Sequence, residues 1–63
     1  MINARCVNFF RDKDGYIQYL RLIDTYGNYI DVTQQQLRRA IKKKELYVDN
    51  IILTKTTIRL KHN

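Results

Sequence analysis

The chain has 63 residues, a net charge of +6 and 44% hydrophobic residues, and it contains no proline. A chain of this length forms a single domain, here residues 1–63, with a small core, and its composition argues against a disordered or linker-like protein. Because Cys6 is the only cysteine and His62 the only histidine, the sequence excludes an internal disulfide and a structural zinc site. We therefore expect self-association, as a homodimer, to provide further stability.

Three strands are predicted in the first half of the chain, at residues 2–10, 16–23 and 29–32. The segments between them, residues 12–15 and 24–28, contain aspartate, asparagine and the two glycines, which are typical of tight turns. In the second strand Leu20 and Leu22 alternate with Tyr19 and Arg21, which indicates a sheet with one solvated face. The first half is thus predicted to be a three-stranded meander.

A helix is predicted from about Gln34 to Lys44. Thr33, followed three residues later by Gln36, forms a capping box that marks the start of the helix. The i, i+3, i+4 spacing of one buried helical face is met by Leu37, Ala40 and Ile41. We expect Ile41 to be the central anchor of this face, so that Ile41→Ala unfolds the monomer.

After the helix the chain returns to a sheet. Leu46 and Val48 alternate with polar positions, Asp49-Asn50 suggests a turn or kink, and residues 51–54 and 58–61 favour a last hairpin. The predicted fold class is α+β: a small antiparallel sheet of about five strands, in the order β-β-β-α-β-β, with one helix packed on one face.

The positive charge is concentrated in the second half of the chain. Residues 1–33 carry four basic and four acidic groups, whereas residues 34–63 carry eight basic groups against Glu45 and Asp49. At about 100° per residue, the four cations of the predicted helix occupy an arc of about 140° on its surface; they are Arg38, Arg39, Lys42 and Lys43. Clustered lysine and arginine side chains are typical of proteins that bind the phosphate backbone of nucleic acid. Five tyrosines offer further stacking surfaces. The candidate residues for binding nucleic acid or another partner are Arg38, Arg39, Lys42, Lys43, Lys44, Arg59, Lys61, Tyr19 and Arg21.

No catalytic residues are predicted. Serine is absent, His62 is the penultimate residue, and Cys6 lies in an apolar strand where a core position is expected. The Asp12-Lys13-Asp14-Gly15 segment resembles the start of a calcium loop, but Ile23 occupies the twelfth position, where a glutamate is required. The two glycines lie in separate turns and form no phosphate-binding loop. We therefore expect a protein that is not an enzyme and has no cofactor or metal.

The stretch from Leu37 to Leu60 contains a helix ending in Ala-Ile plus basic residues, then Val-x-Asn, an apolar pair, Leu-Thr and a closing hairpin. This pattern resembles the C-terminal half of short proteins encoded by phages and integrative elements of Gram-positive bacteria. Lys44-Glu45 stands where such a helix is usually followed by glycine. The resemblance implies a mobile-element origin, and small proteins from that source often bind nucleic acid or block host defence complexes, as anti-CRISPR inhibitors do.

These observations predict a small basic binding module that engages DNA or RNA, or a nucleic-acid-loaded host protein, through the cationic helix face. Two alternatives remain: a protein-binding inhibitor of a host defence complex, and a small dimeric structural protein whose charge serves solubility. Residues 1–6 lack the long apolar run of a signal peptide or membrane span, so a cytoplasmic location in a bacterial host cell, away from membranes, is expected.

Overall fold

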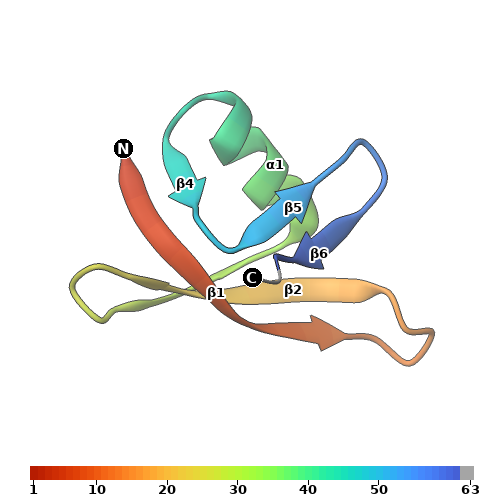
Figure 1. Cartoon of the computed structure of the whole chain (residues 1–63). Coiled ribbons are helices and arrows are strands. Elements are labelled where there is room, and N and C mark those ends of the chain that lie inside the picture. Colours follow the sequence, from red (N-terminus) through yellow and green to blue (C-terminus); the bar gives the residue numbers. More distant parts are fainter. Residues whose placement is uncertain (62–63) are drawn as a thin grey trace.

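The computed structural model describes residues 1–61, and it has the expected α+β architecture (Figure 1). Along the chain, three strands are followed by one helix and then by three short strands. In chain order the elements are β1 (Ile2–Arg11), β2 (Ile17–Asp24), β3 (Tyr29–Val32), α1 (Gln34–Lys42), β4 (Leu46–Val48), β5 (Ile51–Leu53) and β6 (Ile58–Leu60).

Two sheets are present in residues 1–61, where one antiparallel sheet was predicted. The first has four strands in the order β3-β2-β1-β4, and the second is the hairpin β5-β6. β4 pairs with β1 in parallel, with Ile2 opposite Leu46 and Ala4 opposite Val48, so the larger sheet is mixed. α1 supplies the crossover that such a parallel return requires. The predicted kink at Asp49-Asn50 ends one sheet and begins the other, which raises the number of strands from five to six.

The two turns of the meander share one geometry. In each, an aspartate carboxylate oxygen, that of Asp12 or Asp24, accepts hydrogen bonds from the backbone N–H groups two and four residues later, at 2.8 to 3.1 Å. Gly15 and Gly27 close these turns with φ values of 87° and 85°, a region that residues with a side chain rarely occupy. The Asp12 segment is therefore a hairpin turn, as predicted.

A bulge at Val7 changes which β1 residues face the core. Cys6 pairs with Leu22 and Asn8 with Arg21, so Val7 is an extra residue in β1. Before the bulge Cys6 faces the core, and after it Phe9 packs against the core. Phe10 consequently lies on the opposite face of the sheet, where it stacks on Tyr19.

α1 is anchored by Leu37, which is completely buried, rather than by Ile41, which is only partly buried. The expectation for Ile41 is therefore wrong, because the centre of the helical contact lies one turn nearer the start of α1. The capping box of Thr33 and Gln36 is present and fixes that start. The core around Leu37 consists of Ala4, Cys6, Leu20, Leu22, Leu46, Val48 and Ile58.

α1 and the β5-β6 hairpin lie on the same side of the larger sheet (Figure 1). The buried residues of β1, β2 and β4, together with Leu37 and Ile58, form the core between these layers. In the part of the chain that the structure describes, no element covers the other side of the sheet. That uncovered side is called the open face below, and it corresponds to the one solvated face that the alternation in β2 predicts.

Leu37→Ala should destabilise the protein by about 2–5 kcal/mol, since it leaves a cavity at the centre of the core. Ile41→Ala should cost less, because part of the Ile41 side chain is already in water. Urea unfolding followed by circular dichroism measures both free energies. An equal or larger loss for Ile41→Ala would contradict this placement of the core.

α1 ends earlier than predicted, at Lys42, because Lys44 adopts a φ of 59°. The N–H of Lys44 donates to the carbonyl of Ile41 at 3.0 Å, and the N–H of Glu45 donates to that of Ala40 at 2.9 Å. This pair of bonds is a Schellman motif, whose left-handed residue is usually glycine. Lys44 therefore adopts the conformation that a glycine normally provides at this position.

Lys44→Gly should stabilise the fold by about 1 kcal/mol, since a left-handed residue with a Cβ costs roughly that amount. Lys44→Ala removes the same charge but keeps the Cβ, so it should give no such gain. Thermal unfolding of the two variants side by side separates the backbone effect from the charge effect, and a gain shared by both would refute the backbone explanation.

Candidate functional site

The outer face of α1 presents a group of exposed cations. Arg39 and Lys42 lie on the helix, and Lys43 and Lys44 continue from its end; all four side chains are exposed. Among residues 1–61 the ion pairs are Arg5–Asp49 and Arg21–Asp31, so none of the four is neutralised by a carboxylate of the described chain. These four residues are called the cationic ridge below.

Arg38, which was predicted to belong to this group, has a structural contact instead. Its guanidinium donates to the backbone carbonyls of Thr54 and Thr57, at the turn between β5 and β6. The two threonine hydroxyls are themselves hydrogen-bonded at 2.6 Å. Arg38 therefore links the hairpin turn to α1 by hydrogen bonds. Its positive charge lies against the two carbonyl oxygens of that turn.

Arg59 lies near Arg11, which was not among the predicted site residues. It is exposed on β6 opposite Ile52, and it lines a shallow hollow together with Phe9, Arg11, Ile58 and Leu60. Arg11 donates to the carbonyl of Gly15 at 2.9 Å. Arg59 thus shares its surroundings with the end of β1.

The exposed Lys61 follows β6, and its backbone N–H donates to the carbonyl of Asn50 at 2.7 Å. This bond fixes where the chain leaves the hairpin. The predicted site residues of the second half are therefore distributed over three places: the cationic ridge, the Arg38 contact, and the surroundings of β6.

Tyr19 and Arg21 lie on the open face, in a row of side chains that contact one another. This row, called the ladder below, consists of Phe10, Tyr19, Arg21, Tyr29 and Asp31. The rings of Tyr19 and Phe10 are 4.5 Å apart with an interplanar angle of 12°. The Arg21 guanidinium lies 5.0 Å from the centre of the Phe10 ring and 5.9 Å from that of Tyr29, distances typical of cation–π contacts. It also donates two hydrogen bonds to the Asp31 carboxylate, at 2.9 and 3.0 Å.

The charged groups of the ladder stabilise one another. The Arg21 hydrogen bonds lower the pKa of Asp31 below its ordinary value, and hydrogen bonding to Asp31 raises the pKa of Arg21. Arg21 is therefore already satisfied by a partner within the chain. It differs in this respect from the cations of the ridge, which have no carboxylate partner among residues 1–61.

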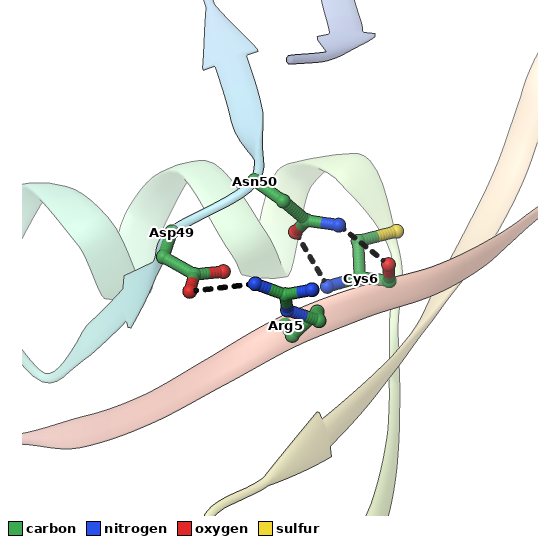
Figure 2. A network of polar contacts seen from close by, with 4 residues as sticks. All are labelled: Arg5, Cys6, Asp49 and Asn50. Atoms are coloured by element: carbon green, nitrogen blue, oxygen red, sulfur yellow. Dashed lines mark hydrogen bonds and ion pairs between the residues drawn. The ribbon is translucent and has the colours of Figure 1, made fainter. Parts of the chain in front are cut away.

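At the β4 end of the open face, Arg5 pairs with Asp49 at 3.3 Å (Figure 2). Figure 2 also shows the neighbouring Asn50, whose side chain accepts from the N–H of Cys6 and donates to its carbonyl, both at 2.8 Å. A hollow of about 550 Å³ lies on this side of the sheet. It is lined by Asn3, Ala4, Arg5, Ile23, Asp24, Thr25, Tyr47 and Asp49.

The Cys6 thiol is buried in the core, as the sequence predicts. Burial raises the pKa of this thiol, and a backbone hydrogen bond with Asn8 offsets the effect only in part. The thiol itself donates weakly to the carbonyl of Asn8 at 3.6 Å. A thiol of this kind stays protonated near neutral pH and is a poor nucleophile. His62, the other group considered for catalysis, lies outside the described residues.

No cluster of three or more histidine, cysteine, aspartate or glutamate side chains suited to a metal ion occurs within residues 1–61. In the same stretch, no helix has the length and apolar character needed to cross a membrane. No family model matches the chain, and neither a curated protein nor a solved structure shows significant similarity to it.

The structural roles of Arg38 and Asn50 were missed by sequence reasoning, because each depends on a contact distant in the chain. Arg38 reaches residues 16 and 19 positions away, and Asn50 reaches a residue 44 positions away. The helical spacing that placed Arg38 with Lys42 is correct. Nothing in that spacing indicates that the hairpin turn lies against one flank of the helix.

Acid should weaken this fold through two carboxylates. The backbone N–H of Asn28 lowers the pKa of Asp24, and Arg21 lowers that of Asp31, both from an ordinary value of 3.8. A lowered folded pKa contributes stability that is fully present above 3.8 and is lost as the pH falls through the folded value. Asp24→Asn keeps an acceptor oxygen but cannot titrate, so its unfolding temperature should fall less on acidification.

Thermal unfolding of the wild type and Asp24→Asn, measured from neutral pH to below pH 3.8, tests this. Asp14→Asn, which removes an exposed carboxylate from the other meander turn, is the matched control. Parallel pH curves for the wild type and Asp24→Asn would contradict the role given to Asp24.

Proposed function

We propose that this protein is a non-enzymatic module that binds nucleic acid through the cationic ridge. The observation that carries the proposal is that Arg39 and Lys42 on α1, and Lys43 at its C-cap, are exposed with no carboxylate partner among residues 1–61. Unpaired cations on a rigid element attract phosphate groups, and they gain further free energy by releasing the counterions of the polyanion.

The separation of the aromatic side chains from the ridge favours contact with the phosphate backbone. Tyr19 and Tyr29 lie on the open face, whereas α1 covers the opposite side of the sheet. A strand bound along the ridge cannot stack its bases on these rings at the same time. We therefore propose binding that depends on backbone charge and discriminates little between sequences.

The setting we propose is the cytoplasm of a bacterial host cell. The support for this is the resemblance of residues 37–60 to short proteins of phages and integrative elements. A nucleic-acid-loaded host protein remains a related partner, since it presents the same phosphates.

The test is binding of a labelled duplex over a series of salt concentrations. The logarithm of the binding constant should fall linearly with the logarithm of salt, by about 0.9 per phosphate contacted. Lys43→Glu should weaken binding and reduce this slope by about 1. Lys13→Glu, in the turn between β1 and β2, makes the same change in net charge away from α1 and should leave the slope unchanged.

Arg38 is left intact in this test, because its replacement would loosen the hairpin. Binding that ignores salt, or an equal effect of Lys43→Glu and Lys13→Glu, would contradict the proposal. A single strand run in parallel shows whether the ridge distinguishes duplex from unpaired nucleic acid.

A further inference from the structure

The open face has the residue composition of a protein interface. Arginine and aromatic residues are enriched in the centres of such interfaces and lysine is depleted. The strands that form this face contribute Phe10, Tyr19, Arg21, Tyr29 and Tyr47 to it. All six lysines of the chain lie elsewhere: in two hairpin turns, at the end of α1, and after β6.

The charges of this face nearly cancel, in contrast to those of the whole chain. Arg5 is paired with Asp49 and Arg21 with Asp31, which sums to zero, and the carboxylate of Asp24 at the margin of the hollow brings the total to −1. The net charge of +6 is therefore carried by the other surfaces. Like charges facing each other across an interface cost several kcal/mol, so two copies meet most favourably through the open face.

The ladder on the open face is ordered before any partner arrives. Arg21 makes its two hydrogen bonds to Asp31 and lies against the rings of Phe10 and Tyr29 within one chain. A guanidinium that is already paired with a carboxylate costs less to bury than an unpaired cation does. Fewer side chains then need to be immobilised on association, which is an additional entropic advantage.

We propose that the open face binds a second copy of this chain, forming a twofold symmetric dimer in which the two larger sheets pack face to face. A typical stable interface buries roughly 800 Å² on each partner, about a sixth of the accessible surface of 5049 Å². The open face is formed by strands of ten, eight, four and three residues, and the proposed dimer requires that most of it be buried. The hollow between Ile23 and Tyr47 provides a recess for an aromatic side chain of the other copy.

Dimerisation through the open face would add buried apolar surface to a domain whose own core is small, a common source of stability in chains of this size. Within residues 1–61, the core of one copy contains eight buried residues, and a chain of this size gains only about 3–5 kcal/mol from such a core. A sheet packed on both faces buries the aromatic side chains that a single copy leaves in water. Tyr29 and Tyr47 are 67% and 53% exposed in the single chain.

The dimer is tested by light scattering on nuclease-treated protein, from low to high micromolar concentration. The wild type should approach twice the monomer mass of 7.6 kDa as concentration rises. The double variant Tyr29→Lys/Tyr47→Lys places unpaired charge on the open face, and it should lose the dimer. The control Tyr16→Lys/Tyr26→Lys makes the same charge change at residues that are 72% and 88% exposed in the meander turns, and it should keep the dimer.

A wild type that stays monomeric at every concentration overturns the proposal, as does a dimer that the control disrupts as strongly as the open-face variant. A second measurement needs no variant. On dilution of the wild type, nuclear magnetic resonance signals of Tyr19, Tyr29 and Tyr47 should shift. Shifts confined to the ridge would overturn the assignment of the interface. Both measurements omit nucleic acid, so their outcome is independent of the proposed function.

Discussion

The side chain of Asn50 joins the two sheets, and the rest of the architecture depends on that junction. β4 pairs with β1 over only three residues, ending with Ala4 opposite Val48, and Cys6 lies two residues further along β1. There the Asn50 amide takes the place of a strand, accepting from the Cys6 N–H and donating to its carbonyl (Figure 2). The Asn50 carbonyl meanwhile holds the end of the hairpin through the N–H of Lys61. One residue thus satisfies backbone groups of β1 and of the end of the hairpin, where buried polar groups without partners would be costly.

The junction determines which side of the sheet is covered. Asn50 turns the chain away from β1, so that the hairpin β5-β6 does not continue the larger sheet. The hairpin instead lies beside α1, on the same side of the larger sheet as the helix. Arg38 then fastens the hairpin turn to the helix. All covering elements of the described chain therefore lie on one side. The cations of α1 point outward from that side, and the paired charges remain on the other.

Local patterns in the sequence were enough to predict the elements themselves. Hairpin turns, the capping box at Thr33 and the alternation of Leu20 and Leu22 with Tyr19 and Arg21 each depend on residues within a few positions, and each is found in the structure. The pairing of β4 with β1 depends on a contact across 44 positions, between Ile2 and Leu46, and no local pattern specifies it. The extra residue at Val7 reverses the alternation within β1, which explains why Phe9 rather than Phe10 reaches the core. For the candidate site, spacing alone grouped the helical cations but did not separate Arg38, which is bound to carbonyls, from Arg39 and Lys43.

The opposite placement of the ridge and the open face makes the two proposals compatible. In a dimer joined through the open faces, the two helices lie on the outside, and the cationic ridges are directed away from each other. One duplex cannot contact both ridges of such a dimer unless it bends around it, and bending over so short a distance is costly. A dimer of this kind would instead hold one nucleic-acid segment on each side. Its affinity for either segment then depends on one ridge alone, whereas its ability to bring two segments together depends on the neutral aromatic face between them.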